Sequence, residues 1–330
     1  MDIFERIMVA GSNGMVGSAL CKLLRKKGYG DQKVGGCILK PSRNELNLLN
    51  YSDVKEWFKK NRPSIVIIAA AKVGGILANS SRPFDFIFEN IKIQTNLIEI
   101  SKEFKIKKIL FLGSSCIYPK YAEQPIKEEA LLDSYLEPSN QWYAIAKISG
   151  IKLCESLYLQ EGINAISLMP CNLYGVGDNY DLTSSHVLPA LIRKFQNAKE
   201  SNQKIVNCWG TGNPLREFLY VDDLAEACIF ALNNWDITNK NAPLDNSSKK
   251  LAWLNVGSGK EISIKDLAEK IANIIGYEGN IFWDKSKPDG TPRKLMDSSR
   301  FKELGWIPKI SLEDGIKFAI EDYKLKKNKF

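Results

Sequence analysis

Short hydrophobic segments alternate with longer amphipathic segments through the first half of the chain. The hydrophobic segments, which predict strands, are Arg6–Ala10, Ile38–Leu39, Ser64–Ala70, Lys108–Gly113 and Ala165–Met169. The amphipathic segments, which predict helices, are Met15–Lys27, Ser52–Asn61, Phe84–Phe104 and Tyr143–Gln160, with Ser52 as the expected cap of the second. Strands that are apolar on both faces and separated by helices predict a parallel sheet covered on both sides. We therefore expect an α/β fold with a doubly wound, Rossmann-type parallel sheet.

The second half of the chain has a less regular pattern. Further helices are predicted at Val187–Lys199, Asp222–Asn233, Ile264–Ile275 and Leu312–Lys324. Segments rich in glycine, proline or polar residues, which predict loops, are Trp209–Pro214, Asn239–Lys250 and Lys287–Pro292. This half is therefore expected to contain further helices joined by loops, one of them, Asp222–Asn233, packed on the main sheet.

Composition narrows the class of protein. Lysine and arginine number 46 against 38 acidic residues, so the formal net charge is +8. This charge suits nucleic-acid binding, an anionic small ligand or solubility alone. The seven cysteines include no CxxC pair and His186 is the only histidine, so we expect neither a metal site nor a disulfide scaffold. No signal peptide is recognisable and the longest apolar run, Ile65–Ala71, is too short for a membrane span, which predicts a cytoplasmic protein.

A glycine-rich turn, Gly11-Ser-Asn-Gly14-Met-Val-Gly17, joins the first predicted strand to the first predicted helix. The glycines permit a tight turn, close approach of a pyrophosphate and close packing of helix on strand, while the helix N-terminus offers free N–H groups to phosphates. Its place between strand and helix favours a dinucleotide site over a glycine turn without a ligand. After the second strand, Lys40 and Arg43 either suit the 2′-phosphate of NADP or are ordinary surface charges.

A tyrosine, a lysine and a serine form a candidate catalytic set. Tyr143 and Lys147 are four residues apart and share one face of the predicted helix. A nearby ammonium, together with the positive nicotinamide ring of an oxidised cofactor, is expected to lower the tyrosine pKa from about 10, so that Tyr143 exchanges a proton with a carbonyl oxygen. Ser114, at the carboxyl end of a predicted strand, is positioned to hydrogen-bond the same oxygen. A Tyr-x-x-x-Lys pair alone is usually an exposed helical pair, but the serine and the glycine turn together favour an oxidoreductase.

With these motifs, the chain resembles the extended short-chain dehydrogenases, and in particular the GDP-L-fucose synthase family. The longer segments that carry the resemblance are AAAKVGGI at Ala69–Ile76, FLGSSCIYP at Phe111–Pro119, WYAIAK at Trp142–Lys147, SHVLPALIRKF at Ser185–Phe195, REFLYVDD at Arg216–Asp223 and KPDGTPRK at Lys287–Lys294. Dehydratases of the superfamily carry a Thr-Asp-Glu type of sequence where this chain has Ser115-Cys116-Ile117.

The resemblance implies a two-stage reaction. GDP-4-keto-6-deoxy-D-mannose would be epimerised at C3 and C5 and then reduced at C4 with NADP(H) as cofactor. It also implies an NADP-binding Rossmann domain of residues 1–177 plus 214–257 and a smaller α/β GDP-sugar-binding domain of residues 178–213 plus 258–330. The two long predicted helices, Phe84–Phe104 and Tyr143–Gln160, would form the interface of a homodimer.

The resemblance also implies roles for individual residues. Ser114, Tyr143 and Lys147 would act at the carbonyl oxygen, with Cys116 as the base and His186 as the acid at carbon. A lone thiol or imidazole is more often structural, but the surrounding motifs favour the catalytic interpretation here. The residues implied in cofactor binding are Gly11, Ser12, Asn13, Gly14, Met15, Val16, Gly17, Arg43, Leu48, Leu112, Gly113, Ser114, Ser115, Lys147, Pro170, Cys171, Asn172, Leu173 and His186. Those implied in GDP-sugar binding are Lys194, Trp209, Arg216 and Asp289. Trp209 taken alone reads equally as core packing.

Two other functions stay open at this point. One is a nucleotide-sugar 4-epimerase or dehydratase that keeps NAD tightly bound. The other is a non-catalytic dinucleotide-binding regulator, for which the positive charge would suit an RNA partner. The complete proton-transfer set argues against the regulator, so no nucleic-acid partner is expected. Relatives often carry an arginine where this chain has Asn13, which leaves Arg43 with more of the 2′-phosphate recognition.

Overall fold

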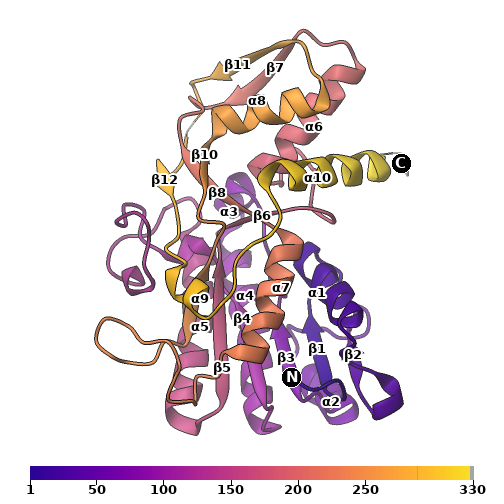
Figure 1. Cartoon of the computed structure of the whole chain (residues 1–330), viewed down its shortest axis with the longest axis vertical. Coiled ribbons are helices and arrows are strands. Elements are labelled where there is room, and N and C mark those ends of the chain that lie inside the picture. The colour runs from indigo at the N-terminus through magenta and orange to yellow at the C-terminus, as the bar shows by residue number, and fades with distance from the viewer. Residues whose placement is uncertain (288, 328–330) are drawn as a thin grey trace.

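A computed structural model describes residues 1–287 and 289–327 of the chain. Its main sheet has six parallel strands in the order β2-β1-β3-β4-β5-β9 (Figure 1). The strands are β1 (Arg6–Ala10), β2 (Cys37–Leu39), β3 (Ile65–Ile68), β4 (Lys108–Leu112), β5 (Asn164–Pro170) and β9 (Trp253–Val256). Because β1, β3, β4 and β5 are buried almost throughout, they form the hydrophobic centre of the molecule, and the predicted α/β Rossmann-type fold is confirmed.

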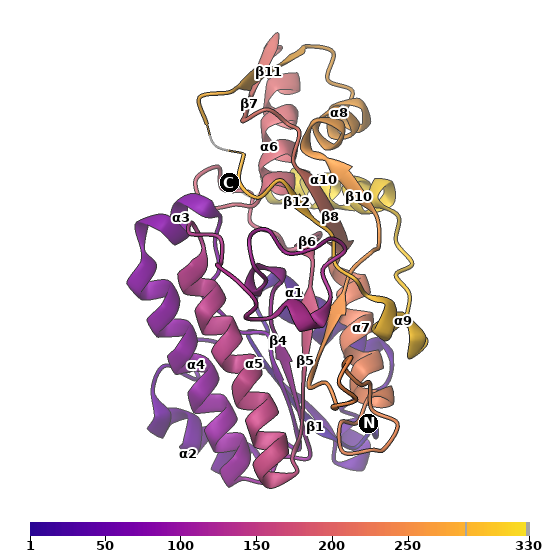
Figure 2. The same ribbon diagram turned by 90° about the vertical axis from the view of Figure 1, so that its left-hand side faces the viewer.

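Helices cover both faces of this sheet. One group consists of α1 (Met15–Lys26) and α7 (Val221–Asn234), which pack against each other. The other group consists of α2 (Tyr51–Asn61), α4 (Pro83–Glu103) and α5 (Gln141–Glu161), with the short helix α3 (Ile76–Ser81) before α4. Figure 2 shows α4 and α5 running side by side along one flank of the molecule. All these helices except α3 were predicted, with ends that differ by at most two residues.

The expected cap of α2 was wrong. Ser52 is the second residue of the helix, and the cap is Asn50, whose Oδ1 accepts from the backbone N–H groups of Ser52 and Asp53 at 2.9 and 3.3 Å. Both asparagine and serine favour this position, so the sequence alone offers two starting points. The structure selects Asn50 as the cap. Its backbone is extended, as is typical of the residue that precedes a helix, and this places its side chain within reach of the first N–H groups of the helix.

The second half forms a smaller α/β region beyond the carboxyl ends of the main strands (Figure 1). Its helices are α6 (Val187–Glu200), α8 (Ile264–Ile275) and α10 (Leu312–Lys327), whereas the short helix α9 (Ser299–Glu303) packs on β9 of the main sheet. Its strands are β6 (Asn172–Tyr174), β7 (Ile205–Trp209), β8 (Leu215–Tyr220), β10 (Glu261–Ser263), β11 (Asn280–Asp284) and β12 (Arg293–Lys294). Strand β8 pairs with β6, β10 and β12, while β7 pairs with β11. These strands were not predicted because they are short and partly exposed.

The connecting segments largely follow the sequence. Asn239–Lys250 forms turns with one isolated bridge, as predicted for a loop. Trp209 ends β7 instead of beginning a loop. Pro288 of the predicted loop Lys287–Pro292 lies outside the described residues. Within the described part of the chain, no helix has the length and apolar character needed to cross a membrane. The division into two domains at the expected boundaries stays a prediction.

Candidate active site

The glycine turn lies at the carboxyl end of β1. Gly11 has φ +85°, and a Cβ there would lie 2.7 Å from the backbone nitrogen of Ala70. A Cβ on Gly17 would lie 2.1 Å from the carbonyl oxygen of Gly11, so helix and turn approach each other too closely for any side chain. Gly14 is exposed and precedes α1 without a side-chain cap, which leaves the first N–H groups of the helix open to an anion. The Ser12 hydroxyl is buried and has no hydrogen-bond partner among the described residues. An anionic ligand at this turn would satisfy these donors.

The residues expected near the adenine end of the cofactor lie on the surface. Asn13 and Arg43 are exposed, Arg43 in the segment after β2. Leu48 is half-buried against the core, and its carbonyl oxygen accepts from Asn96 Nδ2 at 2.9 Å. A positively charged, exposed Arg43 suits a 2′-phosphate, but its role stays a prediction.

The other expected cofactor residues follow β4 and β5. Gly113 extends the pairing of these strands, because its N–H donates to the carbonyl oxygen of Leu168 at 2.9 Å. A Cβ on Gly113 would lie 2.2 Å from the Met169 sulfur, so any side chain here would require Met169 to move. Cys171 N–H donates to the Val256 carbonyl oxygen at 3.0 Å, and Asn172 Nδ2 donates to the Glu217 carbonyl oxygen at 2.7 Å. The remaining members of this group, at the same strand ends, are Leu112, Ser115, Pro170 and Leu173.

Tyr143 and Lys147 occupy the first two turns of α5. Lys147 is buried, and its Nζ donates to the Leu112 carbonyl oxygen at 2.7 Å, which fixes the helix against the end of β4. The same Nζ lies 5.7 Å from the centre of the Tyr143 ring. Burial lowers the pKa of Lys147 to about 8. The two side chains therefore lie together, as the spacing predicted.

The Lys147 ammonium does not by itself lower the pKa of Tyr143 as expected. Burial raises the pKa of Tyr143, and the neighbouring Cys116 raises it further. The loss of hydration is the largest cause of this rise, and the Lys147 Nζ donates to the Leu112 carbonyl oxygen instead of to the phenol. Tyr143 therefore carries its proton at neutral pH and is suited to donate it.

Ser114 and Cys116 lie just beyond β4, where residues Ser115–Ile117 form one turn of 3₁₀-helix. The backbone of Ser114 is extended, and its hydroxyl accepts from Cys116 N–H at 3.4 Å. Burial raises the pKa of the Cys116 thiol, while the charges of Lys294 and Lys147 act in the opposite direction. Cys116 is therefore a buried thiol with two lysine ammonium groups acting on it, unlike a cysteine that only fills space.

Lys294 is a site residue that sequence reasoning missed. It lies on β12, directly opposite Arg216 of β8, and both the Cys116 thiol and the Arg216 guanidinium influence its charge. Burial lowers its pKa. Lys294 ends the KPDGTPRK segment, which was singled out only as a motif, so the segment pointed to the right place without identifying the residue.

His186 lies at the start of α6, where it precedes the first helical residue and retains exposed surface. The surrounding protein nevertheless removes part of the hydration of the imidazole. This desolvation lowers the pKa of His186, so the ring is neutral at pH 7. The loop before it rests on the segment after β3, because Gly75 N–H donates to the Ser184 carbonyl oxygen at 3.0 Å. A Cβ on Gly75 would lie 2.8 Å from the Ser185 carbonyl oxygen. Gly75, the second glycine of AAAKVGGI, therefore lets this loop approach closely.

The four residues expected at the GDP-sugar come together in the smaller region. Lys194 Nζ lies 5.9 Å from the centre of the Trp209 ring, which is half exposed and not part of the core. Asp289 accepts from the backbone N–H and the hydroxyl of Thr211 at 2.7 and 2.8 Å, and its charge acts on Arg216. Asp289 thus holds the turn that follows Trp209. Lys287, not singled out before, also lies 5.8 Å from the Trp209 ring.

The comparisons with known proteins agree with this arrangement. Residues 7–242 match the NAD dependent epimerase/dehydratase family. The chain is 51% identical to GDP-L-fucose synthase 1 of Arabidopsis thaliana, over 98% of this chain and 94% of that protein.

The chain belongs to the GDP-L-fucose synthase family.

Solved structures agree with membership in the GDP-L-fucose synthase family. A GDP-6-OMe-4-keto-L-xylo-heptose reductase of C. jejuni superposes with a TM-score of 0.90 at 37% identity, covering 99% of both chains. A GDP-mannoheptose C4 reductase from Campylobacter jejuni with NADP bound gives a TM-score of 0.86 at 38% identity, covering 98% of this chain and 99% of that one. The fold and the arrangement of the two regions are thus shared by GDP-sugar reductases.

Proposed function

We propose that this protein converts GDP-4-keto-6-deoxy-D-mannose to GDP-L-fucose, by epimerisation at C3 and C5 followed by reduction at C4. The observation that carries the proposal is the position of Cys116. Its thiol interacts electrostatically with Tyr143, Lys147 and Lys294. One site therefore combines a thiol suited to proton exchange at carbon with a phenol and an ammonium suited to a carbonyl oxygen. The identity to the Arabidopsis enzyme supports this assignment.

The residues at the glycine turn fit NADP(H). The open N–H groups at the start of α1 and the buried Ser12 hydroxyl would hold the pyrophosphate, and Arg43 would meet the 2′-phosphate. When bound, NADPH supplies the hydride that the C4 carbonyl carbon receives. Relatives with NADP bound support this choice of cofactor.

Tyr143 and Lys147 act at the C4 oxygen. Tyr143 is protonated at neutral pH and gives its proton to the oxygen as the carbonyl becomes an alcohol. The phenolate that remains lies next to the Lys147 ammonium, which the Leu112 carbonyl oxygen holds in place. Ser114 hydrogen-bonds the same carbonyl oxygen and stabilises the charge that develops on it.

Cys116 and His186 act at carbon. The Cys116 thiolate removes the acidic proton beside the ketone, and the ammonium groups of Lys294 and Lys147 favour that thiolate. The neutral imidazole of His186, which is exposed to solvent, first takes up a proton and then returns it to the opposite face of the sugar ring. Lys194 and Arg216 supply positive charge for the diphosphate, and the exposed face of Trp209 supplies an apolar surface.

We also propose that the protein acts as a homodimer in the cytoplasm. Phe84 and Phe88 of α4 are exposed and stack at 5.1 Å, and Trp142, Ile145 and Leu159 of α5 are exposed on the neighbouring helix. Pairing α4 and α5 with those of a second copy would cover this apolar surface. All seven cysteines are free, as expected in a reducing compartment.

The test is product analysis after incubation with GDP-4-keto-6-deoxy-D-mannose and NADPH. We expect NADPH consumption that depends on the substrate, GDP-L-fucose as the product, and deuterium at C3 and C5 when the reaction runs in D₂O. Turnover of UDP-glucose without a reductant would instead establish a 4-epimerase and contradict the proposal.

A second candidate is a C4 reductase without epimerase activity. The close superposition on the heptose reductase favours it, because that protein is named for reduction alone. The two candidates differ in one result: a simple reductase would consume NADPH and leave C3 and C5 free of deuterium. The electrostatic contact between Cys116 and Lys294 favours the two-stage reaction, since reduction does not require a base at carbon.

A further inference from the structure

We propose that Asn255 is a positioning residue that fixes the segment carrying Cys116 against the segment carrying Lys294, and thereby controls proton exchange at carbon. The inference rests on the proposed function. Asn255 lies in β9, at the edge of the main sheet, and is completely buried. It has no place in the proton-transfer steps described above. Its contacts, however, lead directly to both segments.

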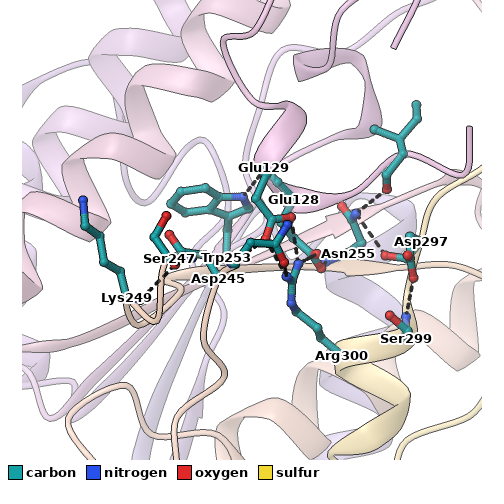
Figure 3. Close-up of polar contacts among 12 residues, drawn as sticks. Glu128, Glu129, Asp245, Ser247, Lys249, Trp253, Asn255, Asp297, Ser299 and Arg300 are labelled. Atoms are coloured by element: carbon teal, nitrogen blue, oxygen red, sulfur yellow. Dashed lines mark hydrogen bonds and ion pairs between the residues drawn. The ribbon is translucent and has the colours of Figure 1, made fainter. Parts of the chain in front are cut away.

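The side chain of Asn255 joins three pieces of chain. Its Oδ1 accepts from the Tyr118 hydroxyl at 2.7 Å, and Tyr118 is two residues beyond Cys116. Its Nδ2 donates to the carbonyl oxygens of Ile126 and Asp297 at 2.9 and 3.1 Å, and Asp297 is three residues beyond Lys294. Figure 3 shows Asn255 between Glu128 and Asp297. The two polar atoms of the side-chain amide thus make three hydrogen bonds, which connect the two segments through one rigid group.

Further bonds hold the same two segments in register. Ile126 N–H donates to the Leu295 carbonyl oxygen and Asp297 N–H to the Ile126 carbonyl oxygen, both at 2.8 Å. On the other side, the buried Glu217 carboxylate accepts from Met296 N–H at 3.0 Å. The segment that carries Lys294 therefore cannot shift without breaking several buried hydrogen bonds.

The backbone of Asn255 is held as well. Its N–H donates to Glu128 Oε1 at 2.9 Å, and the other Glu128 oxygen pairs with Arg300 (Figure 3). Asn255 therefore connects the edge strand, the segment after Cys116 and the segment after Lys294. Because a Coulomb interaction depends on distance, a small shift of Lys294 relative to Cys116 changes how strongly the thiolate is favoured.

Replacing Asn255 itself would break several buried bonds at once and endanger folding, so the test removes one connection. Tyr118→Phe deletes the hydroxyl that ties the Cys116 segment to Asn255. The matched control is Tyr323→Phe, because the hydroxyl of Tyr323 in α10 also donates to an asparagine oxygen, Asn197 Oδ1 of α6, at 2.9 Å in a partly buried position away from the site. Both variants lose the same kind of bond.

Two rates are measured for each variant. Deuterium incorporation into GDP-4-keto-6-deoxy-D-mannose in D₂O reports proton exchange at carbon, and NADP⁺ reduction with GDP-L-fucose reports hydride transfer in the reverse direction. In Tyr118→Phe we expect deuterium incorporation to fall roughly five- to tenfold, the effect of one buried hydrogen bond, with its pH profile moved to higher pH. Hydride transfer should stay within about twofold of wild type, and Tyr323→Phe should preserve both rates.

The outcomes separate this inference from the proposed function. Wild-type protein that incorporates no deuterium would refute the proposed function. Wild-type incorporation together with equal incorporation by Tyr118→Phe would refute the positioning role alone. An equal loss of both rates in Tyr118→Phe would also refute it, because it would indicate a general structural defect.

Discussion

The ion pair between Arg300 and Glu128 provides a quantitative test of the structure. The Glu128 side chain is 1% exposed and that of Arg300 is 17% exposed. The guanidinium also contacts Glu129, with Nη1 at 3.0 Å from Glu129 Oε2. Burial raises the pKa of Glu128, whereas hydrogen bonds from Asn255 N–H and Arg300 act to lower it. Arg300→Ala would leave this buried carboxylate without its cation.

The cost follows from that geometry. Removing one partner of a fully buried ion pair costs about 3–5 kcal/mol, and the partial exposure of Arg300 places this pair near the lower end, at about 3 kcal/mol. For a chain of 330 residues this corresponds to a fall in Tm of roughly 4 °C. The control is Lys59→Ala, which removes an exposed pair with Glu56 at 3.9 Å and should change stability by no measurable amount.

The effect should depend on pH. Without the guanidinium, the folded-state pKa of Glu128 rises further above its unfolded value. A carboxyl group with a raised pKa stabilises the fold below its unfolded pKa, and this stabilisation is lost as the pH rises through the folded pKa. The deficit of Arg300→Ala relative to wild type should therefore be larger at pH 8 than at pH 5. Urea unfolding followed by tryptophan fluorescence measures both deficits. Equal deficits at the two pH values, or a deficit no larger than that of Lys59→Ala, would refute the reasoning.

Four further predictions concern the site and the surface. Tyr143→Phe should slow C4 reduction by roughly 10²–10⁴-fold while NADPH binding measured by fluorescence titration survives; near-normal turnover would assign the proton to another donor. Cys116→Ser should lose deuterium incorporation at C3 and C5 but still oxidise NADPH slowly, and incorporation at the wild-type rate would exclude the thiol as the base. Arg43→Ala should reduce the preference for NADPH over NADH by roughly ten- to a hundredfold, whereas equal losses in kcat/KM for both cofactors would argue against contact with the 2′-phosphate. Burial raises the pKa of Asp178 to about 7, so its stabilising effect is complete below about pH 4 and lost as the pH rises through 7. Asp178→Asn keeps the oxygen that accepts from Asn179 N–H and should be about 1–2 kcal/mol more stable than wild type at pH 8 but not at pH 4; identical urea midpoints at pH 8 would contradict this.

The sequence by itself determined five of the six strands of the main sheet and the long helices that cover it, but not β9 or α3. Strands such as β3 and β4 are buried on both faces, so their residues are apolar without interruption and can be recognised locally. The glycine turn could also be recognised from the sequence. A Cβ at Gly11 or Gly17 would clash with backbone atoms, so both positions require glycine and their spacing appears in the sequence itself. The Tyr143 and Lys147 pair was predicted because helical spacing alone places the two side chains on one face.

The tertiary structure decided what depends on burial and on contacts distant in sequence. The raised pKa of Tyr143 arises from desolvation, which no spacing reveals, and the ammonium that was expected to lower it bonds Leu112 instead. The charge of Lys294 acts on the Cys116 thiol although 178 positions separate the two residues in the chain. The two-residue strand β12, which carries Lys294, is held in the site by its pairing with β8. Nothing in the sequence distinguishes Asn255 from other asparagines, because its hydrogen-bond partners Tyr118 and Asp297 are distant in the chain and are known only from the fold. Local steric and periodic patterns can be read from a chain, whereas charges and hydrogen bonds depend on distances that only folding sets.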